Sequence, residues 1–262
     1  MLKARIIPTL LWKGAGLVKG VAFDSWRRVG TVLPAIKVYN TREVDELVLL
    51  DITATAEKRE PDYESVSEYS AECFVPLTVG GGVRCLQHIQ KLLEAGADKV
   101  GINSTAYTQP ELLSQGAHHF GSQCMVASMD VRRHPNGKYE CFSHCGQTPT
   151  GLEPVTWARR LEELGAGEIL LTSVERDGTM QGYDLDLIRA VSQAVRIPVI
   201  ASGGAGNYEH MRAALQDAGA SAVAAASIFH FTEQTPKEAR EFLATHGIPV
   251  RKSFSTPSQA GP

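Results

Sequence analysis

The sequence predicts a single (β/α)8 TIM barrel, and two features of the hydrophobic pattern carry this prediction. Short runs rich in Val, Ile and Leu recur along the 262 residues, and each is nearly continuous, as in parallel strands buried on both faces. Amphipathic segments separate these runs, which is the alternation of a parallel-sheet barrel. A doubly wound open sheet is the alternative, but it usually has fewer repeats at this length. The predicted strands are 4–11, 46–52, 75–80, 98–103, 124–130, 168–174, 197–204 and 221–227.

Helix and turn signals fall between these strands. The segments "TQPE" (108–111) and "TPKE" (235–238) read as capping boxes that begin helices. After the fifth strand, Asn136-Gly137 between polar and apolar stretches predicts a β-hairpin. We expect residues 1–250 to form the barrel, and residues 251–262 to be a disordered tail because their composition is polar and rich in Ser and Pro.

Composition excludes several classes of function. A net charge of −3 gives no indication of a nucleic-acid or membrane surface, and no apolar run is long enough to span a bilayer. The five cysteines show no CxxC pair and no signal peptide is recognisable, so we expect a reduced, cytoplasmic protein. Cys141, His144 and Cys145 lie close together, but they fit a hairpin better than a ligand set. We therefore expect no metal and no cofactor.

The chain is a two-fold repeat of itself. Residues 75–105 align with 197–228, so that Pro76 meets Pro198 and Gly81 meets Gly203, a shift of 122 residues. The first four strands therefore correspond to the last four, as two half-barrels. With small gaps, the same shift places Leu11, near the end of the first strand, on Asp130, near the end of the fifth.

Glycines and small polar residues follow corresponding strands in the two halves. In a barrel the C-terminal ends of the strands carry the active site. Glycine lets a backbone approach a ligand closely, and N–H groups at a helix N-terminus favour anions. The pattern predicts one phosphate site in each half; the alternative is that the glycines only form tight turns. The predicted residues are Gly81, Gly82, Asn103 and Ser104 in the first half, and Gly203, Gly204, Ala226 and Ser227 in the second.

Several segments together closely resemble the cyclase subunit of imidazole glycerol phosphate synthase. They are "RIIP", "LVKG", "DELVLLDITAT", "TVGGGV", "GADKVGIN", "GAGEILLTSVERDGT", "GYD" and "IASGGAG", and the resemblance extends from about residue 2 to 250. The resemblance implies a heterodimer with a glutaminase subunit that supplies ammonia. It also implies cleavage and cyclisation of a bisphosphorylated aminoimidazole-carboxamide nucleotide, a step of histidine biosynthesis.

The resemblance also implies which residues act. The family uses two aspartates as general acid and base; one is Asp130 here, and the other falls on Leu11, which can neither donate nor accept a proton. The family's loop lysine is Lys19, which could substitute in part. Residues Asp177 and Gly178 border the second phosphate.

The opposite end of the barrel matches the family as well. There the family carries a charged ring that gates ammonia into the barrel. The matching residues are Arg5, Glu46, Lys99 and Glu168, and Asp98 matches a residue that docks the glutaminase.

A paralogous group of this family is encoded with surface-polysaccharide genes. Its members are thought to pass ammonia to a sugar amidotransferase that makes an acetamidino group, and "IIPTLL" and "GLVK" resemble them. Three hypotheses follow. The chain delivers ammonia and binds a phosphorylated ligand in support of nucleotide-sugar modification; or it is a working histidine-pathway cyclase; or it is a non-catalytic activator of its glutaminase. The missing acid favours the first and third.

Overall fold

The predicted fold class is confirmed. The protein was analysed as a computed structural model, which describes residues 3–252, and its twelve strands belong to one sheet. Eight of them are parallel neighbours in the order β10-β11-β12-β1-β4-β5-β6-β7. The barrel strands are β1 (Arg5–Lys13), β4 (Leu47–Asp51), β5 (Leu77–Gly80), β6 (Lys99–Ile102), β7 (Met125–Arg133), β10 (Glu168–Ser173), β11 (Val199–Ser202) and β12 (Ala222–Ala225).

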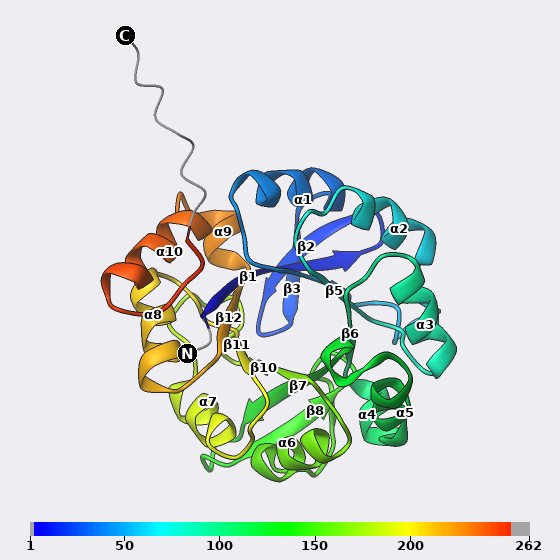
Figure 1. The fold of residues 1–262 in the computed structure, drawn as a ribbon. Helices are drawn as coiled ribbons and strands as arrows, with labels where there is room; N and C mark the ends of the chain where they lie inside the picture. The colour runs from blue at the N-terminus through cyan, green and yellow to red at the C-terminus, as the bar shows by residue number, and fades with distance from the viewer. Residues whose placement is uncertain (1–2, 253–262) are drawn as a thin grey trace.

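Two strand pairings close the sheet into a barrel. β7 pairs with β10, with Asp130 opposite Thr172, and β12 pairs with β1, with Arg5 opposite Ala222. Figure 1 looks along the resulting barrel, with the strands in the centre and helices around them. Because all eight strands run the same way, their C-terminal ends meet at one mouth.

The helices cover the outer face of the barrel because each buries one apolar stripe against the sheet. In α3, for example, His88, Ile89 and Leu92 are buried. The helices are α1 (Val32–Thr41), α2 (Tyr63–Ala71), α3 (Leu86–Glu94), α4 (Ser104–Thr108), α5 (Glu111–Phe120), α6 (Pro154–Glu163), α7 (Leu185–Ser192), α8 (Tyr208–Arg212), α9 (Ser227–Phe231) and α10 (Pro236–Thr245), with a 3₁₀ turn at Ser122–Cys124 and a π-helical segment at Ala213–Asp217.

One predicted capping box is confirmed and the other is wrong. The hydroxyl of Thr235 accepts from the N–H of Glu238, whose carboxylate accepts in return at the start of α10. Thr108 instead ends the short helix α4, and α5 begins after Pro110 without a side-chain cap. The pattern T-x-x-E is local, and here a preceding turn of helix already uses its threonine.

Two additional hairpins extend from the mouth of the barrel. β2 (Gly16–Val21) and β3 (Asp24–Gly30) follow β1, and β8 (Tyr139–Ser143) and β9 (Thr148–Pro149) follow β7. The β7–β8 turn was predicted from Asn136-Gly137. The β2–β3 hairpin was not, because its turn residues Ala22 and Phe23 adopt left-handed conformations without the usual Asn or Gly.

Apolar side chains pack in two separate layers. The larger cluster lies between the sheet and the helices. A smaller one lies inside the barrel and consists of Ile7, Val48, Val126, Leu170, Ile200, Ala222 and Ala224. Within residues 3–252, no helix has both the length and the hydropathy to cross a membrane. Most of the predicted tail, residues 253–262, lies outside the described residues.

Candidate functional site at the barrel mouth

Strand register confirms that Leu11 and Asp130 are counterparts. Leu11 lies opposite Leu50 on β4, and Asp130 lies opposite Thr172 on β10. Leu50 and Thr172 are themselves related by the 122-residue repeat. Both Leu11 and Asp130 line the cavities at the mouth, where one half therefore presents a hydrocarbon and the other a carboxyl group.

The Asp130 carboxyl group is placed in conditions that suit proton transfer. It is 8% exposed, and the side-chain amide of Asn103 donates to it at 3.2 Å. Burial, followed by the nearby charge of Asp177, raises the pKa of Asp130 from 3.8 to about 7, while Arg132 acts in the opposite direction. A group with a pKa near neutrality can both give and accept a proton at physiological pH.

Lys19 belongs to a strand, which corrects the expectation that it lies on a loop. It is in β2, only 2% exposed, and its Nζ donates to Asp177 Oδ2 at 2.5 Å. The β2–β3 hairpin is also held at its tip, where the N–H of Ala22 donates to the Asp177 carbonyl at 2.8 Å. The hairpin thereby connects the first strand of one half to the loop after β10 in the other, and it carries a cation to the second half.

The predicted residues of the second half lie together. Asp177, Gly178, Gly203, Gly204, Ala226 and Ser227 all line one cavity, together with Lys19. Ser227 begins α9, is 5% exposed, and has a hydroxyl with no hydrogen-bond partner among the described residues. Thr9 Oγ1 lines the same cavity and is likewise buried without a partner. Two unpartnered hydroxyls beside an ammonium group suit an anion with several acceptor oxygens.

The predicted residues of the first half also lie together, but their polar groups are already engaged. Gly81, Gly82, Asn103 and Ser104 line another cavity, which we call the first cavity because it lies in the first half; the cavity of Lys19 and Ser227 is the second cavity. The Ser104 hydroxyl accepts from the backbone N–H of His144 at 3.0 Å, and it donates to Asn103 Oδ1 at 3.3 Å. The turn after β8 therefore occupies the hydroxyl whose counterpart is free in the second half.

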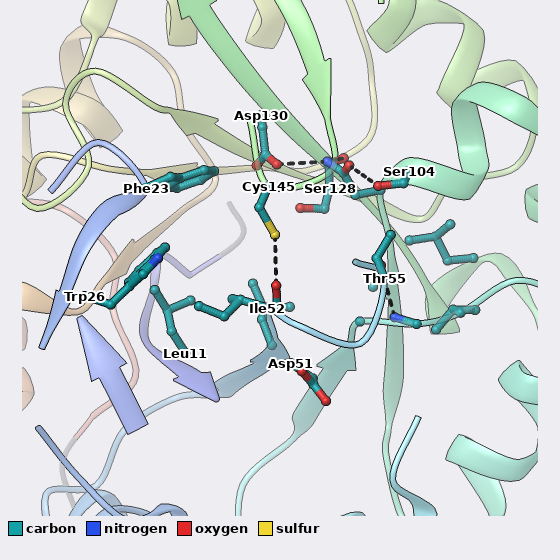
Figure 2. Close-up of a pocket in the computed structure, with 17 residues that line it drawn as sticks. Leu11, Phe23, Trp26, Asp51, Ile52, Thr55, Ser104, Ser128, Asp130 and Cys145 are labelled. Atoms are coloured by element: carbon teal, nitrogen blue, oxygen red, sulfur yellow. Dashed lines mark hydrogen bonds between the residues drawn. The ribbon is translucent and has the colours of Figure 1, made fainter. Parts of the chain in front are cut away.

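Two aromatic residues at this site were not identified from the sequence. Phe23 and Trp26 come from the β2–β3 hairpin and line the first cavity. Figure 2 shows them with Leu11 on one side, across from Thr55 and Ser104. The sequence signal was weak, because recognising these side chains required knowing that the hairpin folds over the mouth.

The cysteine and histidine group near the β8–β9 turn does not form a ligand set. Burial raises the pKa of the Cys141 thiol to about 12 and that of Cys145 to about 11, which disfavours the thiolate that a metal needs. Cys145 Sγ instead contacts the carbonyl of Ile52 at 3.2 Å. Across residues 3–252, no three potential ligands gather at a position that could hold a metal ion.

At the opposite end of the barrel, the four residues of the predicted ring form a closed cycle of ion pairs. Glu46 and Glu168 each bind both cations: Arg5 Nη1 at 2.7 and 2.8 Å, and Lys99 Nζ at 3.0 Å in both cases. The charges alternate in sign around the ring, and the ion pairs between them offset part of the cost of burying the four side chains. The apolar cluster inside the barrel lies between this ring and the mouth.

Asp98 lies at the same end and is exposed. Its Oδ2 accepts from the backbone N–H of Leu77 at 2.8 Å, at the start of β5. Asp98, which directly precedes β6, therefore fixes the start of β5 and still presents a carboxylate to solvent.

One protein-family model matches most of the chain. The family model described as "Histidine biosynthesis protein" matches residues 5–235, which include all eight barrel strands and both cavities at the mouth. Members of that family are enzymes of histidine biosynthesis.

Proposed function

The chain belongs to the histidine biosynthesis protein family, and we propose that it is a cyclase-like subunit that receives ammonia from a glutaminase partner. In this proposal the ammonia crosses the barrel to a phosphorylated ligand at the mouth and supports acetamidino modification of a nucleotide sugar. The observation that carries the proposal is that the charged ring is complete while the expected acid–base pair is not, since the counterpart of Asp130 in the first half is Leu11.

The barrel interior supports a path for ammonia. The ring of Arg5, Glu46, Lys99 and Glu168 is closed, so passage of ammonia requires at least one of its ion pairs to open. Beyond the ring, the interior is lined by aliphatic side chains, among them two alanines of β12. An apolar lining favours neutral ammonia over ammonium, because a charged ion loses its hydration there.

The second half of the mouth supports binding of a phosphate. Lys19, the free hydroxyls of Thr9 and Ser227, and the turns at Gly178 and Gly203 border one cavity. A phosphate oxygen that accepts from Lys19 would compete with Asp177, which currently holds this lysine. Phosphate binding would thereby weaken the ion pair between Lys19 and Asp177. It would also change the electrostatic environment of Asp130, on which the charge of Asp177 acts.

A working histidine-pathway cyclase is the second candidate. Asp130 supports it, because a carboxyl group with a pKa near 7 could serve as acid in one step and as base in the next. Loss of one of two proton-transfer groups costs on the order of 100-fold in rate. A third candidate, a non-catalytic activator of the glutaminase, gains no support from the free hydroxyls at the mouth.

Ammonia-dependent turnover of the bisphosphorylated aminoimidazole-carboxamide nucleotide tests the proposal. The purified chain is compared with Leu11→Asp and Asp130→Asn. We expect no turnover by the unchanged chain and measurable turnover by Leu11→Asp, because the mutation restores the second acid. Turnover by the unchanged chain that Asp130→Asn abolishes would instead establish the second candidate.

A glutaminase assay tests the partner. Glutamine hydrolysis by the candidate glutaminase is measured with and without the chain, and with Asp98→Lys as the interface variant. Stimulation that Asp98→Lys weakens supports the heterodimer. If the chain stimulates the glutaminase but phosphorylated ligands at the mouth do not change that stimulation, the third candidate, a non-catalytic activator, is favoured.

A further inference from the structure

Two histidines occupy corresponding places behind the two glycine turns of the mouth. His88 on α3 and His210 on α8 are separated by 122 residues, the shift that relates the two halves. The two helices lie on opposite sides of the barrel (Figure 1). Each follows the turn that lines one cavity, residues 81–83 in the first half and 203–205 in the second. Among residues 3–252, neither histidine lines either cavity, so any role that they have in binding acts through the turns.

Each ring contacts the backbone of its turn in the same way. In the first half, the N–H of Arg84 donates to Nδ1 of His88 at 3.3 Å. In the second half, the N–H of Gly206 donates to Nδ1 of His210 at 3.2 Å. The two donors are also related by the shift of 122 residues. The same contact in both halves indicates a common role for the two rings.

Further contacts fix the turn of the second half. The carbonyl of Gly206 accepts from Nε2 of Gln234 at 3.1 Å, and the N–H of Gly182 donates to the carbonyl of Gly204 at 2.8 Å. The ring of His210 also packs beside Gly182, since a Cβ atom added to Gly182 would lie 3.6 Å from the ring. Of these contacts, only the bond from Gly206 to the histidine depends on a protonation state.

The contacts of His210 determine which of its ring nitrogens carries the hydrogen. A neutral imidazole accepts at one nitrogen only, and both Nδ1 and Nε2 have a possible donor. Nε2 lies 3.3 Å from Nδ2 of Asn207, whose side chain is exposed and can donate to water instead. The backbone N–H of Gly206 is half-buried and directed at Nδ1. We therefore assign the hydrogen to Nε2 and the acceptor role to Nδ1.

The surroundings of His210 keep its ring neutral. Burial lowers the pKa of His210 below the usual value of 6.5, and the charge of Arg176, from the loop after β10, acts in the same direction. Glu209, in the same helix, acts in the opposite direction. At physiological pH the ring is therefore uncharged, and Nδ1 is available to the turn.

The surroundings of His88 differ although its contact to the turn is the same. Its Nε2 lies 3.8 Å from a carboxylate oxygen of Glu60, which also pairs with Lys91 at 3.8 Å. The ring of Tyr63 meets the His88 ring edge to face, with the centroids 6.5 Å apart. Nδ1 of His88 lies 3.2 Å from the carbonyl of Gly82 as well. A protonated ring would donate to that carbonyl instead of accepting from the turn.

We propose that His88 and His210 are positioning residues that hold the two glycine turns in the shape that receives the ligand, and that protonation of His210 releases the turn of the second half. The inference rests on the phosphate site of the proposed function and adds a control by pH to that site. Protonation places a hydrogen on Nδ1, where it faces the N–H of Gly206. Because two donors cannot bond to each other, the turn loses this anchor, and Gly203 and Gly204 shift at the cavity wall.

Nuclear magnetic resonance on the ligand-free chain tests the contact itself. The full chain, labelled with ¹⁵N at histidine and glycine, is titrated from about pH 8 to about pH 5, the range in which histidine changes charge. We expect Nδ1 of His210 to be the unprotonated nitrogen at the higher pH, and the Gly206 amide signal to shift with the same midpoint as the ring. In His210→Asn, the amide oxygen replaces Nδ1 as acceptor, so the Gly206 signal should no longer follow a titration.

Calorimetric titration with sulfate, which keeps its charge over this range, tests the effect on binding. We expect the unchanged chain to lose about fivefold or more in sulfate affinity, relative to His210→Asn, as the ring becomes protonated, because the turn loses a hydrogen bond. His210→Leu should bind weakly at both ends of the range. A purely electrostatic role of the ring predicts the opposite sign, since a positive charge near the cavity would strengthen anion binding. His119→Asn on the exposed surface of α5 is the control and should change neither measurement.

The first half supplies an independent test of the paired design. Hydrogen exchange of the Arg84 amide should accelerate about fivefold or more in His88→Leu, because the amide loses its acceptor. His88→Asn should exchange like the unchanged chain, since its side-chain oxygen replaces Nδ1. Equal exchange in all three proteins would overturn the role of His88.

The outcomes separate this inference from the phosphate site. If Nδ1 of His210 carries the hydrogen at neutral pH, or if the Gly206 amide does not follow the ring, the inference is wrong even if sulfate binds. If sulfate binds His210→Leu as tightly as the unchanged chain, or more tightly once the ring is protonated, His210 does not position the site. If sulfate does not bind at all, the phosphate site is refuted, and the titration of the Gly206 amide alone decides whether the histidine holds the turn.

Discussion

The two halves of the barrel share a backbone design but differ in the side chains at the mouth. A Cβ atom on Gly81 would lie 2.2 Å from the Asp51 carbonyl oxygen, and one on Gly203 would lie 2.6 Å from that of Ser173. Asp51 and Ser173 are related by the same 122-residue shift as the two glycines. Each half therefore brings the turn after one strand against the end of the preceding strand in the same way.

The side chains of the two halves have diverged at corresponding positions. Leu11 has a hydrocarbon side chain where its counterpart Asp130 has a carboxyl group; the Ser104 hydroxyl is engaged, whereas that of Ser227 has no partner among residues 3–252. Close backbone packing therefore constrains both halves alike, whereas the side chains that face the mouth can differ between the halves. The side chains that differ between the halves are therefore the candidates for function, and the shared backbone contacts are the candidates for stability.

Removing the acid of the second half gives the largest expected effect. Because burial raises the pKa of Asp130 from 3.8 to about 7, the folded state holds its proton more tightly than the unfolded state. Its contribution to stability is therefore lost as the pH rises from about 4 to about 7. Asp130→Asn should lack this slope, and its free energy of unfolding relative to the unchanged chain should rise by up to roughly 4 kcal/mol across that window. Urea titrations at several pH values measure the difference; a constant difference would contradict the raised pKa.

The ion-pair ring provides a matched test of symmetry at the other end of the barrel. Glu46→Gln and Glu168→Gln each leave two cations facing one carboxylate. Both should lower the free energy of unfolding, by about 3 kcal/mol, because a buried charge loses its partner. The two variants should agree within about 0.5 kcal/mol, since each glutamate contacts both Arg5 and Lys99. A large difference between them in urea denaturation would show that the halves are unequal here as well.

Alanine at the paired glycines tests the shared backbone. Gly81 and Gly203 have φ values of 110° and 90°, and an added Cβ atom would meet a backbone oxygen in both cases. Gly81→Ala and Gly203→Ala should each destabilise the fold by about 2–3 kcal/mol. Gly137→Ala is the control, because its φ of 83° is similar but no atom lies within 4 Å of the added Cβ. The stability of the three variants is measured by thermal unfolding. If all three lose the same amount of stability, the effect comes from the backbone conformation alone.

The paired serines should give the smallest effects and the clearest contrast. Ser104→Ala removes an acceptor from the N–H of His144 and should cost about 1 kcal/mol of stability. Ser227→Ala removes a buried hydroxyl that has no partner in the described part of the chain, so the ligand-free protein should be unchanged or slightly more stable. Inorganic phosphate should bind Ser227→Ala more weakly and Ser104→Ala normally. The reverse pattern in a titration would place the anion in the first half.

The sequence by itself determined the architecture and the correspondence between the two halves. Continuous apolar strands require burial on both faces, and a repeat of 122 residues relates the halves, so that the barrel and the pairing of Leu11 with Asp130 followed from pattern alone. The ring of Arg5, Glu46, Lys99 and Glu168 came from resemblance, and the structure brings all four into contact.

Only the tertiary structure decided which groups at the mouth are free. The sequence could not show that His144 engages Ser104 while Ser227 has no partner among residues 3–252, because such contacts join segments that are distant along the chain. It could not show the β2–β3 hairpin either, since the turn at Ala22 and Phe23 lacks local turn signals and is held by contacts to Asp177. Periodicity and turn composition are local properties, whereas cavity walls and proton affinity arise from neighbours that only folding brings together.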